Sequence, residues 1–171
     1  MFIESIILHN YRAYRGHNKT SFKPDTKNIF LVAGNNGFGK TTFLTSLVWC
    51  LYGKLMADVD DKFRRDINDA QGYKNYARQS LHKELANAVN AYEVSLEERK
   101  QIVKHGYSSE NEYIKEDSQY YVEIGLTDVF IPSIPCRTIT IRRTYDYFLD
   151  IESVEVLIDG QANELAKEVG Y

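Results

Sequence analysis

The fold of this 171-residue chain is decided by one stretch, Gly34-Asn35-Asn36-Gly37-Phe38-Gly39-Lys40-Thr41. Before it, Ile29–Ala33 is a continuous apolar run that leads into a glycine, which is typical of a strand buried on both faces. After it, Thr41–Tyr52 carries apolar residues at the spacing of a buried helix, and Gly53 suits the end of that helix. The positions expected to be buried are Phe43, Leu44, Leu47, Val48 and Leu51. The sequence therefore predicts a strand, a glycine-rich loop and a helix in succession.

The spacing within the loop matches the Walker A pattern, in which a glycine is followed by four residues, then glycine, lysine and serine or threonine. Glycines let the backbone curl so that several N–H groups point at phosphates, which then lie at the positive end of the following helix. A glycine-rich turn that matches by chance is disfavoured by the predicted strand and helix on either side. The pattern therefore predicts a site for ATP and Mg²⁺.

The roles of the loop residues follow from their chemistry. Lys40 is expected to reach the β- and γ-phosphates as a point charge and is the candidate catalytic residue. The hydroxyl of Thr41 is the predicted Mg²⁺ ligand, because Mg²⁺ prefers oxygen ligands. The residues expected to contact the nucleotide are Gly34, Asn35, Asn36, Gly37, Phe38, Gly39, Lys40, Thr41 and Thr42.

The composition is that of an ordinary globular domain, with 43% hydrophobic and 26% charged residues. The formal net charge of −3 gives no strongly basic balance, so any DNA contact must be local or lie elsewhere. Cys50 and Cys136 lack metal-ligand spacing and are interpreted as reduced thiols. No apolar run approaches the roughly 18 residues of a membrane span, and the N-terminus does not resemble a signal peptide. A cytoplasmic location without membrane contact is therefore expected.

The remaining segments predict strands at both ends of the chain and helices between them. Strands are expected at Phe2–Leu8 and Thr20–Phe22, separated by a polar stretch, 9–19. Beyond Gly53, Asp58–Asp69 is predicted to be a surface loop or an irregular helix, and Tyr76–Lys104 a helix. The apolar stripe of that second helix comprises Leu81, Leu85, Val89, Tyr92, Leu96 and Val103, although alternation at Ala91–Leu96 leaves a strand as the alternative.

The C-terminal part reads as an antiparallel meander. A loop at His105–Ser118 is followed by three segments with strand character, which are Tyr120–Leu126, Arg137–Tyr147 and Val154–Ile158. Asp159-Gly160 is a strong hairpin signal, and Gln161–Val169 is expected to start a helix. Together with the loop unit, this order predicts an α/β fold of the P-loop NTPase class with an antiparallel β meander.

Three motifs carry a resemblance to a known family. They are Leu8-His9-Asn10-Tyr11-Arg12-Ala13-Tyr14, the loop itself, and Trp49-Cys50-Leu51-Tyr52-Gly53. Together they resemble the N-terminal lobe of SMC-like ABC ATPases, the group that includes the structural-maintenance-of-chromosomes proteins. Within the group, the third motif looks most like DndD, the ATPase of bacterial DNA phosphorothioation systems. So do Thr140-Ile141-Arg142-Arg143-Thr144-Tyr145 and Val156-Leu157-Ile158-Asp159-Gly160.

This resemblance implies further site residues. Asn10 and Arg12 would border the nucleotide, with Arg12 on phosphate or ribose; the alternative for Arg12 is a solvated loop arginine. Asn36 would face the γ-phosphate, or else be a turn asparagine in a left-handed conformation.

The resemblance also implies what a complete ATPase head needs: a Q-loop glutamine, a signature motif with Ser-Gly and a Walker B Asp-Glu pair. The best Walker B candidate, Val154–Asp159, is followed by glycine, so a hairpin turn explains it better. Residues 1–171 are therefore expected to be an N-terminal lobe, with a coiled coil and a C-terminal lobe outside this sequence.

The implied partners are the protein's own C-terminal lobe, a second head in a homodimer, DNA bound by the complete protein, and other DNA-modification proteins. The expected function is that of a DNA-processing ATPase, DndD-like in DNA sulfur modification or a related restriction or defence system. The alternatives are another SMC-like ATPase of DNA repair, recombination or phage defence, and a compact P-loop kinase with Arg142 or Arg143 as its lid arginine. A transporter ATPase subunit is disfavoured, because such subunits carry both lobes in one uninterrupted domain.

Overall fold

The computed structural model describes residues 1–23, 29–100, 118–130, 132 and 137–162, with only the backbone described for 92–100. Its strands are β1 (Phe2–Tyr11), β2 (Tyr14–Ser21), β3 (Gln119–Thr127), β4 (Thr138–Asp146), β5 (Ile151–Ile158) and β6 (Gln161–Ala162). They form one antiparallel sheet in the order β2-β1-β3-β4-β5-β6. The helices are α1 (Lys40–Tyr52), α2 (Met56–Val59), α3 (Asp61–Asp69), α4 (Tyr73–Arg78) and α5 (Lys83–Lys100), with a 3-10 turn at Gly53–Leu55.

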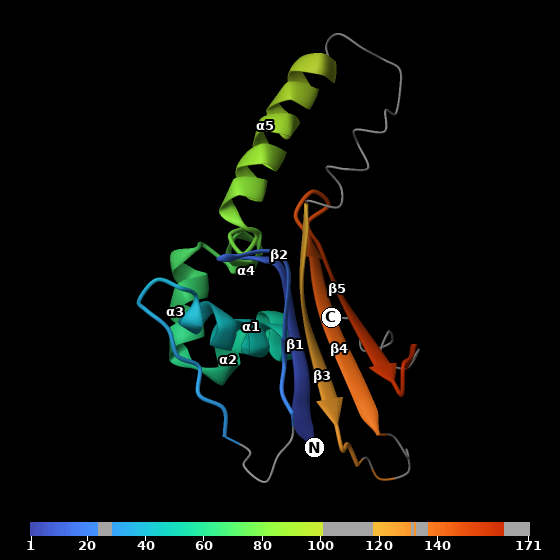
Figure 1. The fold of residues 1–171 in the computed structure, drawn as a ribbon. Coiled ribbons are helices and arrows are strands. Elements are labelled where there is room, and N and C mark those ends of the chain that lie inside the picture. Colours follow the sequence, from blue (N-terminus) through green and yellow to red (C-terminus); the bar gives the residue numbers. More distant parts are fainter. Residues whose placement is uncertain (24–28, 101–117, 131, 133–136, 163–171) are drawn as a thin grey trace.

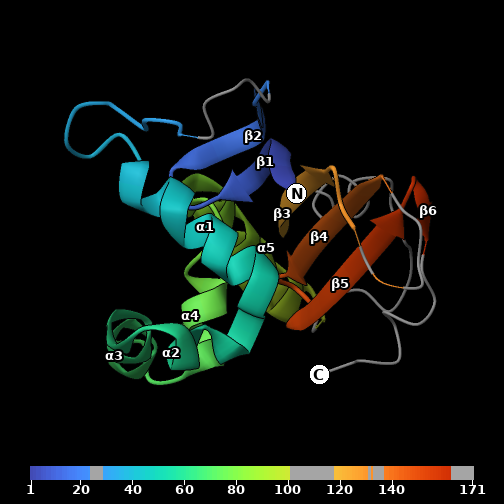
Figure 2. The ribbon, with the colours of Figure 1, turned by 90° about the horizontal axis from the view of Figure 1, so that it is seen from below.

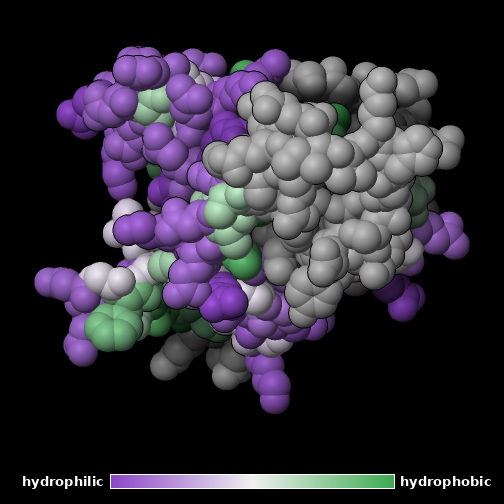
Figure 3. Space-filling view, turned by 90° about the horizontal axis from the view of Figure 1, so that it is seen from above, coloured by the Kyte–Doolittle hydropathy of each residue, from purple (hydrophilic) through white to green (hydrophobic). Residues whose placement is uncertain are grey.

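Helices α1 to α4 lie on one face of the sheet, while α5 projects beyond its end (Figures 1 and 2). The N-terminal half of β3 carries its most buried side chains toward the helices: Tyr120, Val122 and Ile124 are all 1% exposed or less. Seen from the side of α5, the described surface is mostly hydrophilic (Figure 3). The structure is thus a two-layer arrangement in which the sheet is the platform for α1, and the predicted α/β fold with an antiparallel meander is confirmed.

An aromatic cluster joins α1 to the sheet. The Trp49 ring centroid lies 5.6 Å from that of Tyr11 and 5.1 Å from that of Tyr120, and Tyr120 stacks on Tyr145 at 5.5 Å. Trp49, Tyr11 and Tyr120 are fully buried. Aromatic pairs of this kind contribute about 0.5–1.5 kcal/mol each beyond the area they bury, so this cluster helps to hold α1 on the sheet.

The predicted burial of α1 is only partly right. Phe43 is buried, but Leu44 and Leu51 are 56% and 47% exposed. The face against the sheet is instead that of Trp49 and Cys50, with the small polar Ser46 between them and Phe43. The Ser46 hydroxyl is satisfied locally by donating to the Phe43 carbonyl at 2.6 Å, so it does not prevent close packing. Helix α1 therefore carries a second apolar face that the described part of the chain leaves exposed.

The predicted strand Ile29–Ala33 is wrong for the described structure. These residues belong to no strand, and the side chains of Ile29 and Leu31 are 89% and 90% exposed. A strand buried on both faces needs neighbours in its own sheet, and all six described strands pair with one another in the antiparallel sheet. Residues 29–33 therefore have the composition of a core strand, but no described strand lies beside them to pair with.

The N-terminal hairpin is longer than predicted. β1 continues through His9 and Asn10 to Tyr11, and β2 begins at Tyr14 rather than at Thr20. β2 is the edge strand and its side chains are alternately half-buried and exposed, which is why a polar stretch can form it.

The polar middle of the chain is helical. Of the predicted surface loop or irregular helix at Asp58–Asp69, the first two residues end α2 and Asp61–Asp69 form α3. The Asp60 carboxylate between them caps α3 by accepting the Lys62 N–H at 2.7 Å. The helix predicted at Tyr76–Lys104 is interrupted between α4 and α5, because the backbone there pairs with β1 through Tyr11 and Leu81 instead. Of the predicted stripe, Leu81, Leu85 and Val89 are buried; the side chains of Tyr92 and Leu96, and all of Val103, lie outside the described residues.

The C-terminal strands agree with the predicted meander, and Asp159-Gly160 turns β5 into β6. Gln161 and Ala162 are strand rather than helix, because they pair with Ile158 and Leu157. Of the loop predicted at His105–Ser118, only Ser118 is described, and it lies in a turn; residues 105–117, the rest of the predicted helix at 163–169, and Cys136 lie outside the described residues. Within the described ranges no helix is both long and apolar enough to cross a membrane.

Candidate nucleotide-binding site

The phosphate loop leads directly into α1. Gly37 and Gly39 have φ angles of +86° and +88°, in the left-handed region that favours glycine. Gly39 is the N-cap of α1, and its carbonyl accepts the Phe43 N–H at 2.8 Å, which is the first bond of the helix. The first turn of α1 contains no acidic residue, and no side chain caps its N-terminus. The N–H groups at this end therefore remain available to an anion, and the helix dipole favours negative charge there.

Lys40 lies across the loop that it belongs to. Its ammonium donates to the carbonyl of Asn35 at 2.8 Å and to that of Gly34. These two carbonyls sit five and six residues before the lysine, so the side chain spans the curl of the loop. A cation at this position, next to the uncapped N-terminus of α1, fits the charge of a phosphate group.

Thr41 and Thr42 occupy the first turn of α1. The side chain of Thr41 is exposed and that of Thr42 is half-buried. Neither hydroxyl bonds to another of the described residues, and Thr41 follows the lysine directly, as the Walker A pattern requires. The donor set of the loop, which combines backbone amides, one ammonium and one exposed hydroxyl, therefore fits a phosphate chain with Mg²⁺.

Asn36 lies in an exposed turn that the Phe38 N–H closes weakly on the Asn35 carbonyl, at 3.4 Å. Asn36 is not among the described residues with positive φ, so the left-handed alternative for it is wrong. A side chain that faces the γ-phosphate stays a prediction.

Asn10 and Arg12 lie at the end of β1 and in the turn to β2, both with positive φ. Asn10 is 3% exposed, and its Oδ1 accepts the Gly16 N–H at 2.8 Å, so this side chain closes the turn. The Arg12 guanidinium lies 4.9 Å from the centre of the Tyr76 ring, and its Nε donates to the Ser80 hydroxyl at 3.2 Å. The alternative of a solvated loop arginine therefore does not fit; contact of either residue with nucleotide stays a prediction.

Sequence reasoning missed the role of Tyr14. Its hydroxyl donates to the Gly39 carbonyl at 3.2 Å, and this contact brings the start of β2 against the end of the phosphate loop. The only sequence signal was the place of Tyr14 in the first motif, because a contact across 25 positions leaves no local pattern.

The opposite end of α1 is held by a buried network that sequence reasoning also missed. Arg143 on β4 is 8% exposed, donates to the Cys50 carbonyl at 3.0 Å, and forms an ion pair with Glu152. Glu152 in turn accepts from the Tyr73 hydroxyl, which accepts from the Trp49 indole at 3.0 Å. This network fixes the sheet, α1 and α4 to one another.

Neither candidate lid arginine is free to act. Arg143 is committed to the network above, and Arg142 pairs with Glu123 while its guanidinium lies 4.6 Å from the Tyr121 ring. The kinase alternative thus loses the residues that it would need.

Asp159 is a turn residue rather than a Walker B aspartate. Its carboxylate accepts the backbone N–H groups of Arg137 and Thr138, both at 2.9 Å, and its φ is +48°. These bonds lower the pKa of Asp159 below its usual value. The hairpin interpretation of Asp159-Gly160 is therefore confirmed.

Comparison with known proteins agrees with this geometry. Residues 5–155 match the family model of the AAA domain. A solved structure from work on the ATP-driven dimerization and DNA-stimulated activation of SMC ATPases matches with a TM-score of 0.50 and 16% sequence identity, over 95% of this chain and 72% of that one. No curated protein sequence matches the chain. With its phosphate loop, antiparallel sheet and intervening helices, the chain belongs to the AAA domain family and has the fold of the N-terminal lobe of an SMC-like ABC ATPase, a P-loop NTPase.

Proposed function

We propose that this chain is the ATP-binding lobe of a DNA-processing SMC-like ATPase, and that hydrolysis requires its C-terminal lobe and a second head. The observation that carries the proposal is the phosphate loop, in which Lys40 lies across the curl and the uncapped start of α1 adjoins it. ATP supplies the anionic phosphate chain, and Mg²⁺ would be held by Thr41 together with phosphate oxygens. Lys40 binds and orients the β- and γ-phosphates.

Exposed apolar side chains before the loop and along α1 indicate where a C-terminal lobe would pack. Ile29 and Leu31 before the loop, and Leu44 and Leu51 on α1, are all exposed. Apolar runs of this kind on a surface mark an interface, and Ile29–Ala33 has the composition of a strand that is buried between neighbours. We propose that the C-terminal lobe supplies those neighbours, so that residues 29–33 become a strand when the two lobes join.

A second head is proposed because the phosphate loop alone does not supply every group that hydrolysis needs. Hydrolysis needs a group that positions the attacking water in line with the γ-phosphate. Among the described residues, the one aspartate considered for this task, Asp159, is engaged by the hairpin. The solved SMC ATPase matched above comes from work on ATP-driven dimerization and DNA stimulation. ATP-driven pairing of heads, stimulated by DNA, is therefore the mechanism we propose here.

The finer assignment is to a DndD-like protein of DNA sulfur modification or the related restriction system. It rests on the resemblance of Trp49–Gly53 and of the β4 and β5 stretches. In the structure, Trp49 and Arg143 have packing roles, so these motifs also serve the fold. Another SMC-like ATPase of DNA repair, recombination or phage defence is the alternative, and both share the same ATP chemistry.

The test is steady-state ATP hydrolysis by the complete protein, with and without duplex DNA. We expect hydrolysis that rises more than linearly with protein concentration, increases with DNA, and is lost in Lys40→Ala. Phosphorothioate content of cellular DNA, measured by mass spectrometry in a Lys40→Ala strain, distinguishes a DndD-like protein from another SMC-like ATPase. Loss of the modification or of restriction against unmodified DNA supports the DndD-like assignment, and unchanged modification and restriction contradict it.

A further inference from the structure

Tyr14 packs on the last glycine of the phosphate loop. It is the first residue of β2, and its hydroxyl donates to the Gly39 carbonyl. A Cβ on Gly39 would lie 3.1 Å from the Tyr14 hydroxyl and 3.2 Å from two of its ring carbons. The tyrosine ring therefore fills the space where a side chain at position 39 would be. Burial raises the pKa of Tyr14, so its hydroxyl remains a donor at neutral pH.

The turn that carries Tyr14 is held by the junction between α4 and α5. The Arg12 N–H donates to the Ser80 carbonyl at 2.7 Å, and the His82 N–H donates to the Asn10 carbonyl at 2.8 Å. The Arg12 side chain adds its bond to the Ser80 hydroxyl and its stacking on Tyr76. Backbone and side-chain bonds thus couple the turn to residues 78–82, the α4–α5 junction from which α5 starts and which we call the base of α5.

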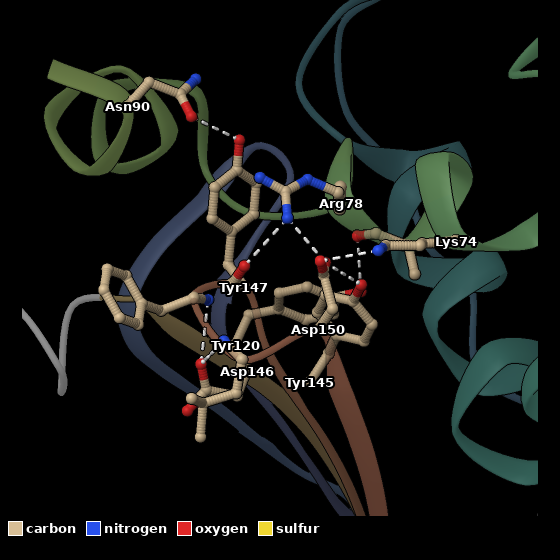
Figure 4. Close-up of polar contacts among 11 residues, drawn as sticks. Lys74, Arg78, Asn90, Tyr120, Tyr145, Asp146, Tyr147 and Asp150 are labelled. Carbon is tan, nitrogen blue, oxygen red and sulfur yellow. Dashed lines mark hydrogen bonds and ion pairs between the residues drawn. The ribbon is translucent and has the colours of Figure 1, made fainter. Parts of the chain in front are cut away.

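The base of α5 is coupled in turn to the hairpin between β4 and β5 (Figure 4). Arg78 pairs with Asp150 at 2.6 Å, donates to the Tyr147 carbonyl at 3.2 Å, and stacks 4.0 Å above the Tyr147 ring. The Tyr147 hydroxyl reaches Asn90 on α5 at 2.8 Å. Helix α5 projects away from the sheet and from α1 to α4 (Figure 1), and its first residue, Lys83, directly follows this base.

We propose that Tyr14 is a positioning residue for the phosphate loop, and that it is the last link through which the base of α5 acts on nucleotide binding. This inference rests on the proposed binding of ATP by the loop. It adds a route from the projecting helix to the site: the base of α5, then the Asn10–Ala13 turn, then Tyr14, then Gly39.

The test compares Tyr14→Phe with Tyr52→Phe in the 171-residue chain. Tyr14→Phe keeps the ring and removes one hydrogen bond, while Tyr52 is an exposed tyrosine at the C-terminal end of α1 whose hydroxyl makes no hydrogen bond to the described residues. We expect Tyr14→Phe to weaken MgATP binding by about three- to tenfold, the range of one hydrogen bond, and Tyr52→Phe to leave it unchanged. The urea midpoint of unfolding should stay close to wild type in both.

Two further measurements separate positioning from general stability. Hydrogen exchange at the Phe43 amide, which bonds to the same Gly39 carbonyl as Tyr14 and needs no nucleotide, should quicken in Tyr14→Phe and not in Tyr52→Phe. Arg78→Ala, which loosens the base of α5, should weaken MgATP binding by a smaller factor in the Tyr14→Phe background than in wild type.

Equal MgATP affinity and equal exchange in Tyr14→Phe and Tyr52→Phe would overturn the positioning role. Equal factors for Arg78→Ala in the two backgrounds would overturn the route through Tyr14. If instead the wild-type chain and Lys40→Ala both fail to bind MgATP, the proposed function fails, and the exchange measurement still decides whether Tyr14 holds Gly39.

Discussion

Replacing Gly53 by alanine tests how the far end of α1 is held against the sheet. Gly53 has φ +51° and ψ −126°, a conformation that a residue with a side chain rarely adopts. An added Cβ would lie 2.7 Å from Arg143 Cζ and 2.7 Å from Glu152 Oε1, which belong to an ion pair whose arginine is buried and whose glutamate is half-buried. The new methyl group must therefore strain the backbone and also displace the pair.

The expected cost follows from these two effects. Backbone strain of this kind costs about 1–3 kcal/mol. Breaking a buried ion pair fully costs about 3–5 kcal/mol, and a shifted pair that keeps part of its contact costs less. We therefore expect Gly53→Ala to lower the free energy of unfolding by about 3–5 kcal/mol, a large share of the roughly 5–15 kcal/mol typical of a domain.

Urea unfolding followed by tryptophan fluorescence measures this cost directly, because Trp49 is the one tryptophan and is fully buried. The matched control is Gly160→Ala, since Gly160 has φ +79° but no atom within 4 Å of an added Cβ. The control carries only backbone strain, about 1–2 kcal/mol. Losses that agree within about 1 kcal/mol between the two variants would refute the packing of Gly53 against Arg143 and Glu152.

Three further predictions concern the site and the hairpin. Thr41→Val, which removes mainly a hydroxyl, should weaken ATP binding more with Mg²⁺ than without it, and calorimetry that finds equal losses would count against Thr41 as the ligand. The 171-residue chain alone should hydrolyse ATP far below about 1 per second, and a faster rate in a phosphate-release assay that Asp159→Asn abolishes would reinstate a compact complete enzyme. Backbone hydrogen bonds lower the pKa of Asp159, so its stabilisation should be present above about pH 4 and be lost as the pH falls further. Acid unfolding of Asp159→Asn should lack that contribution, and a curve that parallels wild type would contradict it.

The features that the sequence predicts well are those with a local cause. The Walker A spacing, the start of α1 after Gly39 and its end at Gly53 each depend on neighbouring residues. The meander is predictable for the same reason, because alternation and the Asp159-Gly160 turn are local signals.

The features that the sequence predicts poorly depend on distant partners. Residues 29–33 read as a core strand, but pairing requires neighbours that the described chain does not supply. The helix predicted from Tyr76 breaks because Ser80 and His82 bond to the β1–β2 turn, some 70 positions away. The contact of Tyr14 with Gly39 has the same character, since nothing near either residue announces the other.

The central claim is that this chain binds ATP through the loop that Lys40 spans. Isothermal titration of MgATP into the 171-residue chain and into Lys40→Ala tests it most directly. Because the hydrogen bonds that Lys40 makes to the described residues all go to loop carbonyls, its loss should leave the unfolding midpoint close to that of wild type. The account predicts saturable binding to the wild-type chain and binding to the folded variant that is absent or severely weakened. Equal MgATP affinity in the two folded proteins would contradict it.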